Sequence, residues 1–186
     1  MKSKYKTKKK IMLKIVEGNL LNSNEQYICQ QTNCISVNAH GLSETIRIKS
    51  GADPYSHRRS LNGRNHAIPE DCDVPGTIKV FKNVICMFAQ YGMGKPYKYG
   101  NTVEDSYEKR LLWFKLCLFE ISKLKPTSLA FPYNIGCGLA GGNWQDYLAV
   151  LKHFSNYFQI PVTLYKIYFY FSKIKWNEVI FLKIKI

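Results

Sequence analysis

Acidic residues are scarce in this chain, which has 13 Asp and Glu against 27 Lys and Arg in 186 residues and a formal charge of +14. The six cysteines form no C-x-x-C pair and match no histidine spacing, so no metal site is expected. No apolar run is long enough to span a membrane, and nothing near the start resembles a signal peptide. We therefore expect an intracellular protein, cytoplasmic or nuclear, with reduced thiols and no membrane contact.

Apolar residues make up 46% of the chain and aromatic residues 14%, which is typical of one globular domain. Six lysines fall within residues 1–10, where no apolar periodicity occurs. This segment is predicted to be a disordered basic tail, with a weak nucleic-acid contact or a nuclear address as the alternative. Without these six charges the formal charge of +14 falls to about +8, which still favours an anionic partner.

Strand and helix patterns alternate along residues 11–166, which predicts an α/β fold with a central mixed, largely parallel sheet. Strands are expected at 11–17, 27–32, 34–37, 77–81, 84–89, 128–133 and 161–166. Helices are expected at 44–50 (capped by Ser43 and closed by Gly51), 53–59 (opened by Asp53 and Pro54), 105–124 and 144–157. Residues 167–186 are predicted to add one or two strands.

Four glycines lie within seven positions of the segment 131–144, between a predicted strand and a predicted helix. Glycine leaves backbone N–H groups open to a ligand, and a helix start favours anions. Asn143 is a suitable N-cap for the helix that follows. The segment therefore predicts a phosphate cradle, with a glycine-rich turn without a ligand as the alternative.

Gly136, Gly138 and Gly141 also fit the dinucleotide-binding pattern G-x-G-x-x-G. That reading needs an acidic residue about twenty positions later and further βαβ units, and the chain has neither. No Gly-Lys-Ser/Thr follows the glycines, which excludes a P-loop.

Four segments together resemble a macro domain, the ADP-ribose-binding module. They are the turn Gly18-Asn19-Leu20, QQTNCISVNAHGLSETI at 31–46, PGTI at 75–78 and IGCGLAGG at 135–142. The resemblance covers residues 11–166 and is closest to the branch with the terminal ADP-ribose protein glycohydrolase and the ADP-ribose-1″-phosphate phosphatase. It implies a three-layer α/β/α fold that binds ADP-ribose without a cofactor.

The resemblance also implies three contact regions for ADP-ribose. Adenine would meet Gly18, Asn19 and Leu20. The diphosphate and distal ribose would meet a first loop that contains Asn33, Asn38, His40, Gly41 and Leu42. The diphosphate would also meet the glycine-rich segment, through Ile135, Gly136, Cys137, Gly138, Leu139, Ala140 and Gly141.

The sequence departs from the family at Asn19, at Gln90 and Ala140, and in the first loop, where the usual glycine run reads Ala39-His40-Gly41-Leu42. Asn19 stands where many macro domains have an aspartate that accepts from adenine. Gln90 and Ala140 stand where the glycohydrolase has its lysine and aspartate, so the covalent lysine mechanism is not expected.

His40 and Asn33 are the candidate catalytic residues, because hydrolysis at an anomeric carbon needs a proton-transferring group and a positioned water. The alternatives are a solvated or packed histidine and an asparagine that holds its loop. Asp53 and His57 are spaced for a carboxylate–imidazole pair, with an N-cap role for Asp53 as the alternative. Cys137 lacks an identifiable base and is interpreted as packing.

Two other features near the expected site are interpreted with alternatives. Trp144 either closes over the ligand or packs in the core. Residues 92–100 form either a covering loop or a plain surface loop.

The sequence thus predicts an ADP-ribose-binding protein that hydrolyses an ADP-ribosyl derivative. The substrates considered are ADP-ribosylated protein, ADP-ribosylated nucleic acid and ADP-ribose-1″-phosphate. The alternatives are a non-catalytic reader of ADP-ribosylated macromolecules and a basic RNA-binding module.

Overall fold

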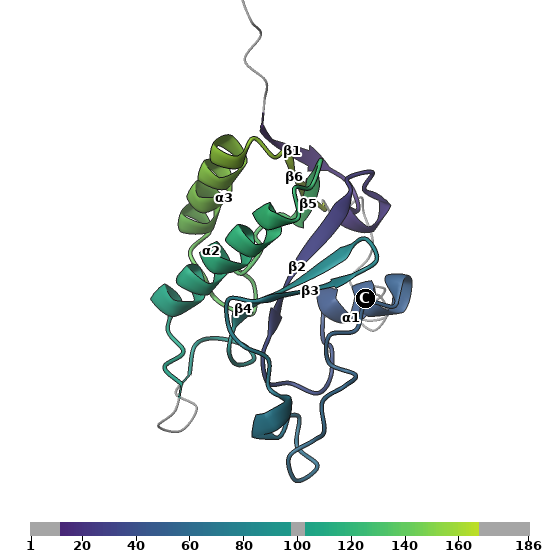
Figure 1. The fold of residues 1–186 in the computed structure, drawn as a ribbon, viewed down its shortest axis with the longest axis vertical. Helices are drawn as coiled ribbons and strands as arrows, with labels where there is room; N and C mark the ends of the chain where they lie inside the picture. The colour runs from purple at the N-terminus through teal and green to yellow at the C-terminus, as the bar shows by residue number, and fades with distance from the viewer. Residues whose placement is uncertain (1–11, 98–102, 168–186) are drawn as a thin grey trace, which may run out of the picture.

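One six-stranded sheet organises the protein (Figure 1). The computed structural model describes residues 12–97 and 103–167. The strand order is β1-β6-β5-β2-β4-β3, and only β3 is antiparallel to its neighbour in this sheet, so the sheet is mixed and largely parallel as predicted. The strands are β1 Leu13–Glu17, β2 Tyr27–Asn33, β3 Ile78–Phe81, β4 Val84–Gln90, β5 Leu129–Pro132 and β6 Val162–Lys166.

Helices cover the sheet on both faces, which gives the three predicted layers (Figure 1). The helices are α1 Leu42–Ser50, α2 Tyr107–Lys123 and α3 Trp144–Phe158, with two 3₁₀ turns at Leu20–Asn22 and Pro69–Asp71. The larger core lies under α2 and α3, where Phe114 and Leu151 are fully buried against the sheet. A smaller core lies under α1, around Ile46 and Val84.

Capping residues explain where the two long helices begin. The Ser106 side chain accepts from Lys109 N at the start of α2, and the Asn143 side chain accepts from Gln145 N at the start of α3. Gly51 closes α1 in the left-handed conformation, as predicted. The predicted turn at Lys82 and Asn83 joins β3 to β4.

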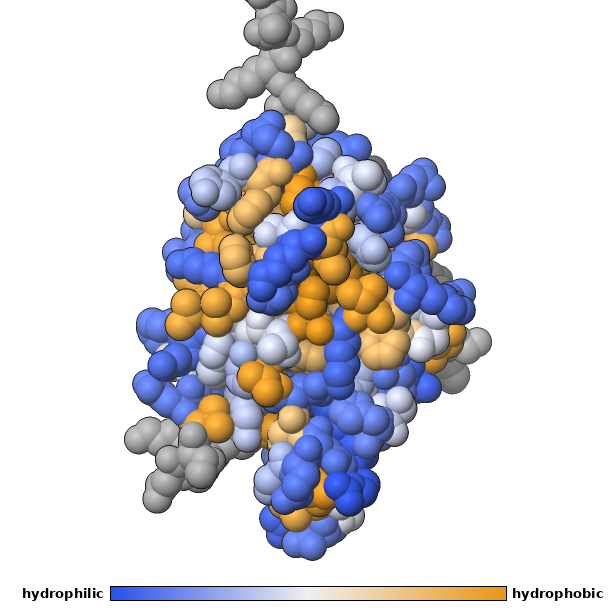
Figure 2. Space-filling view, viewed as in Figure 1, coloured by the Kyte–Doolittle hydropathy of each residue, from blue (hydrophilic) through white to orange (hydrophobic). Residues whose placement is uncertain are grey.

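The outer face of α2 is more apolar than a simple amphipathic helix would be. Leu112, Leu116 and Phe119 are about half exposed there, at 48%, 44% and 51%, while Phe114, Leu118 and Ile121 face the core. Figure 2 shows apolar side chains among charged ones on the side of the molecule that carries α2.

The predicted strand at 34–37 is wrong, because the chain turns directly after β2. The Asn33 side-chain oxygen accepts from the backbone N–H groups of Ile35 and Ser36, at 3.1 and 2.7 Å. An asparagine that bonds its own following backbone starts a turn and ends a strand.

The helix expected at 53–59 is also absent, and Ser43 does not cap α1. The Asp53 side chain accepts from Tyr55 N at 2.9 Å, which makes a local turn without a helix after it. Gly41 is the N-cap of α1, without a side-chain cap, and the Ser43 hydroxyl instead bonds the Tyr55 hydroxyl at 3.4 Å.

The sheet divides at its carboxyl edge between β2 and β5. These neighbours pair only at Tyr27–Leu129 and Ile28–Ala130, although both strands continue further. The connection after β2 leads to α1 on one face, and the one after β5 leads to α3 on the other. In parallel sheets, a reversal of this kind opens a crevice where ligands bind.

Two predicted segments lie outside the described residues. They are the basic tail at 1–10 and the C-terminal extension at 167–186, of which only Ile167 is described. Within the described ranges, no helix has the length and apolar content to cross a membrane.

Candidate functional site

A cleft of about 490 Å³ opens where β2 and β5 separate. One wall is the first loop, residues 33–42, and the other is the glycine loop, residues 134–142. The floor is polar: Gln31 Nε2 donates to Gln90 Oε1 at 2.9 Å, and Gln90 Nε2 donates to Gly92 O at 2.9 Å. Both glutamines line the cleft, so its base is set by a directed chain of hydrogen bonds.

A buried arginine holds the start of the first loop. The Arg58 side chain is fully buried and donates to Ser36 O at 2.6 Å and to Asn33 O at 3.0 Å. Its charge is paired with Asp73 at 2.6 Å, and its guanidinium lies over the Tyr55 ring. Removal of Arg58 would leave two buried carbonyls and a carboxylate without this partner.

Asn65 holds the rest of the first loop, a role that no sequence pattern predicted. Its side-chain oxygen accepts from the N–H groups of Val37 and Asn38, both at 3.1 Å. Its side-chain nitrogen lies 3.4 Å from His40 Nε2 and 3.3 Å from Met93 Sδ. Asn65 therefore links the first loop to His40 and to Met93.

The glycine loop folds back on itself. Gly136 has a φ of +74°, and its carbonyl accepts from Gly142 N at 3.0 Å. This fold pairs the amides of Ile135, Cys137, Gly141 and Gly142. In the described part of the chain, the remaining loop amides of cleft-lining residues have no hydrogen-bond partner; they belong to Asn134, Gly136, Gly138, Leu139 and Ala140.

The opposite wall ends at the start of α1. Gly41 provides no side-chain cap, and Leu42 and Ser43 of the first turn line the cleft. The first N–H groups of a helix have no partner within the helix and carry a partial positive charge. None of the described residues lining the cleft is Asp, Glu, Lys or Arg. The partial positive charge of the unpaired backbone N–H groups therefore makes the cleft suitable for an anion.

Most of the predicted contact residues come together in this cleft. From the first loop, the lining includes Asn33, Asn38, His40, Gly41 and Leu42. From the glycine loop, it includes Ile135, Gly136, Gly138, Leu139 and Ala140. Cys137 and Gly141 do not line it, although they lie within the loop.

The predicted adenine turn lies at the same sheet edge but outside the cleft lining. Gly18 N donates to Lys166 O at 3.1 Å, and the Asn19 side chain caps the 3₁₀ turn through Leu21 N at 2.9 Å. The Lys166 ammonium lies 5.1 Å from the ring centre of Tyr133, which does line the cleft. An adenine contact at Gly18, Asn19 and Leu20 stays a prediction.

Cys137 is placed for packing. Partial burial raises the pKa of its thiol to about 11, and the thiol donates to Ile135 O at 3.3 Å. A thiol with a raised pKa and no adjacent base is a poor nucleophile at neutral pH.

The predicted pair of Asp53 and His57 does not form. His57 Nε2 lies 3.8 Å from Asp73 Oδ2 and 3.2 Å from Lys79 Nζ, because the segment is not helical. Trp144 packs against Tyr133, with ring centres 4.7 Å apart, beside the larger core. Of the segment 92–100, Met93 and Gly94 line the cleft, and 98–100 lie outside the described residues.

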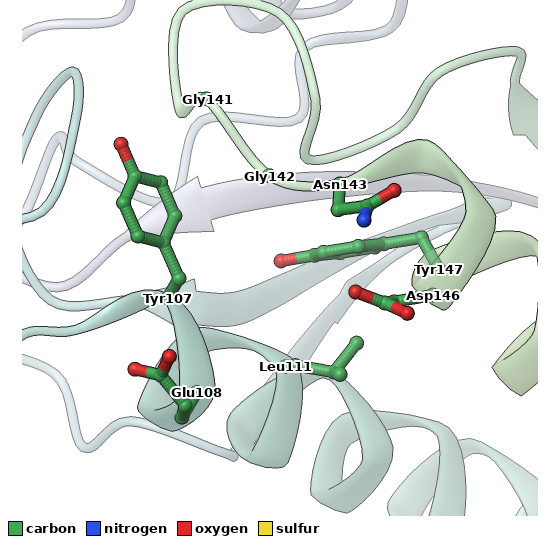
Figure 3. A pocket seen from close by; sticks show the side chains of 8 residues that line it. All are labelled: Tyr107, Glu108, Leu111, Gly141, Gly142, Asn143, Asp146 and Tyr147. Atoms are coloured by element: carbon green, nitrogen blue, oxygen red, sulfur yellow. The ribbon is translucent and has the colours of Figure 1, made fainter.

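A smaller cleft of about 300 Å³ lies on the far side of the glycine loop (Figure 3). It separates the first turns of α2 and α3, and the Tyr107 ring rises beside Gly141. The carboxylates of Glu108 and Asp146 are both at this cleft. In the part of the chain that the structure describes, no three His, Cys, Asp or Glu side chains gather as a metal site would require.

No family model and no curated protein matches the chain. Solved structures do match it. The macrodomain of Mycobacterium tuberculosis DarG superposes with a TM-score of 0.57 at 17% identity, over 83% of this chain and 97% of that one. This chain has a macrodomain fold.

Two further macrodomains agree with this assignment. The macrodomain of Thermus aquaticus DarG has a TM-score of 0.53 at 17% identity, over 84% of this chain and 98% of that one. The Trypanosoma brucei macrodomain, solved in complex with ADP-ribose, has a TM-score of 0.54 at 10% identity, over 84% of this chain and 63% of that one. At these identities the likeness is one of fold.

Proposed function

We propose that this macrodomain binds ADP-ribose in the cleft between the first loop and the glycine loop. The observation that carries the proposal is the set of unpaired backbone amides at Gly136, Gly138, Leu139 and Ala140. Gly136 is half-buried and Ala140 is buried, whereas Gly138 and Leu139 are exposed, so the four unpaired N–H groups lie at the rim and wall of the cleft, where an anion can accept from them. A diphosphate offers several acceptor oxygens for such a group of donors.

The opposite wall supports the same ligand. The uncapped start of α1 faces the cleft through Leu42 and Ser43, so a diphosphate would lie between two sources of free N–H groups. Among the described residues, no carboxylate lines the cleft to repel it. The polar floor at Gln31 and Gln90 and the side chains of Asn33 and Asn38 would suit ribose hydroxyls. The Trypanosoma brucei macrodomain was solved with ADP-ribose, which supports this choice among diphosphates.

Calorimetric titration with ADP-ribose tests the proposal. We expect a dissociation constant in the micromolar range for the unmodified protein and no measurable binding for Gly138→Glu. A Cβ added at Gly138 would meet no atom within 4 Å, so this variant should fold while it places a negative charge in the cleft. Asn156→Glu adds the same charge at an exposed position on α3 and should bind normally. Absence of heat with the unmodified protein would reject the proposal.

Hydrolysis of an ADP-ribosyl derivative is the second candidate, with His40 and Asn33 as the proposed catalytic residues. It is favoured by the position of His40 in the cleft lining, because an imidazole side chain is able to donate or accept a proton. Asn33 uses its side-chain oxygen within the loop, so only its amide nitrogen remains for a substrate or a water. A non-catalytic reader is favoured by the cleft lining, which within residues 12–97 and 103–167 contains no carboxylate and no lysine.

Turnover assays separate these two candidates. Suitable substrates are ADP-ribosylated protein, ADP-ribosylated nucleic acid and ADP-ribose-1″-phosphate. Release of ADP-ribose or phosphate that His40→Ala reduces at least tenfold would support the enzyme, and binding of all three without turnover would support the reader. Full turnover by His40→Ala would remove His40 from the mechanism. If the full chain hydrolysed the nucleic-acid substrate faster than a chain without residues 1–10, a contact between that substrate and the basic segment would be supported.

A further inference from the structure

A second buried arginine lies behind the glycine loop. Arg110, in the first turns of α2, is only 1% exposed. Two of its five N–H groups donate to Asp105, at 2.7 Å from Nε and 2.6 Å from Nη2. The other three donate to carbonyl oxygens of Gly94 at 2.5 Å, Ala140 at 3.2 Å and Gly92 at 3.3 Å. Every donor of the guanidinium is therefore used.

The three carbonyls belong to two separate segments that border the cleft. Gly92 and Gly94 follow β4, whereas Ala140 is in the glycine loop. Asp105 adds a further tie, because its Oδ2 accepts from Gly92 N at 3.2 Å. One rigid planar group thus sets the distance between the two segments.

The start of α2 meets the glycine loop at a second point. The Tyr107 ring stands against Gly141, where an added Cβ would lie 3.4 Å from the tyrosine oxygen (Figure 3). Gly141 N in turn closes the tight turn to Gly138 O at 3.0 Å. The loop is therefore supported by α2 from behind, on the side away from the cleft.

This arrangement needs an arginine. Lysine has three donors on a single atom and cannot span two carbonyl-bearing segments and a bidentate carboxylate. A buried ion pair commonly adds little net stability over an apolar replacement, while its directed bonds fix geometry.

We infer that Arg110 is a positioning residue for ADP-ribose: it fixes the glycine loop against the 92–94 segment so that the unpaired amides of Gly138, Leu139 and Ala140 are held ready for the diphosphate. The inference rests on the proposed function. Arg110 itself lies behind the loop and is not expected to touch the ligand.

Arg110→Lys tests the inference, and Ile121→Ala is the matched control. Ile121 is fully buried on the same helix, eleven residues further along, and its truncation destabilises the core without a change in the loop contacts. We expect Arg110→Lys to weaken ADP-ribose binding at least tenfold, and Ile121→Ala to weaken it less than twofold at a comparable unfolding midpoint. Asp105→Asn is a milder variant of the same pair, to be used if Arg110→Lys does not fold.

Amide hydrogen exchange without ligand separates a local effect on the glycine loop from a general loss of stability, because a general loss accelerates exchange throughout the protein. Exchange at Gly141 and Gly142 should accelerate in Arg110→Lys relative to the amides of α3, but not in Ile121→Ala. Equal binding by a folded Arg110→Lys or Asp105→Asn, or an equal loss in Ile121→Ala, would overturn the inference. If the unmodified protein bound no ADP-ribose, the proposed function would fail, and unchanged exchange would separately show that Arg110 does not position the loop.

Discussion

Gly136 and Gly138 are two residues apart in one loop, yet the structure assigns them different constraints. Gly136 has a positive φ, and a Cβ there would approach Tyr147 Cε1 and Gln31 Oε1, the latter at 2.7 Å. Gly138 has open space around it. The fold of the loop thus constrains Gly136, whereas it leaves room for a side chain at Gly138.

We expect Gly136→Ala to lower the free energy of unfolding by about 1–3 kcal/mol, because it forces a strained φ and a clash against buried groups. Gly138→Ala should change it by less than about 0.5 kcal/mol. Urea unfolding of both variants measures the difference. Equal stability of the two would show that the loop adapts to a side chain at Gly136.

Cys137 illustrates how burial within the same loop controls reactivity. Because partial burial raises the pKa of its thiol to about 11, only a trace of thiolate exists at neutral pH. The rate of iodoacetamide labelling at Cys137 should therefore still rise between pH 9 and pH 10, where that of free cysteine flattens. Peptide mass spectrometry across this range measures it, and a plateau at pH 9 would contradict the assignment.

At the scale of elements, Asn143 joins the glycine loop to α3. Its side chain satisfies one of the first amides of the helix, through Gln145 N at 2.9 Å. Asn143→Ala should lower the free energy of unfolding by about 1 kcal/mol, and Asn143→Ser should restore most of it, because serine also caps. Chemical denaturation of the three proteins tests this expectation. A serine variant as unstable as the alanine variant would show that Asn143 acts other than as a cap.

Local sequence signals predicted the elements whose cause is local. The apolar spacing along 107–123, the N-cap at Asn143 and the turn at Lys82 and Asn83 each act over a few residues, and the structure confirms them. The glycine cluster likewise predicted a loop between a strand and a helix.

Distant partners explain what the sequence could not reveal. The segment 53–59 has helix-start residues, but Arg58 is drawn to carbonyls at Asn33 and Ser36, more than twenty positions away. No local sequence pattern distinguishes Arg110 or Asn65. Their roles depend on Ala140 and His40, which only the folded chain brings near them.

At the scale of the whole molecule, we expect the positive formal charge to affect both the folding stability and the binding of an anion. A formal charge of +14 repels itself, and the Debye length falls from about 30 Å at 0.01 M salt to about 8 Å at 0.15 M. Raising potassium chloride over this range should raise the unfolding temperature by about 2–4 °C, as expected for about 1 kcal/mol in a chain of this size. The same change should weaken binding of the anionic ADP-ribose. Added salt should therefore raise the unfolding temperature and lower the affinity for ADP-ribose. The first effect reports repulsion between positive charges of the protein, and the second reports attraction of the anionic ligand.

Removal of residues 1–10 provides the control for this experiment. It takes six lysines from the chain and reduces the formal charge from +14 to +8. The dependence of the unfolding temperature on salt should shrink accordingly. An unchanged dependence would place the relevant repulsion within the folded domain.

The short contact between β2 and β5 has a mechanical consequence. Only two residue pairs join the half-sheet β1-β6-β5 to the half-sheet β2-β4-β3. A ligand held by both cleft walls would connect the two half-sheets at the carboxyl edge, where β2 and β5 do not pair. The two halves would then fluctuate as one unit, so amides on β5 and β2 should become protected together when the cleft is filled.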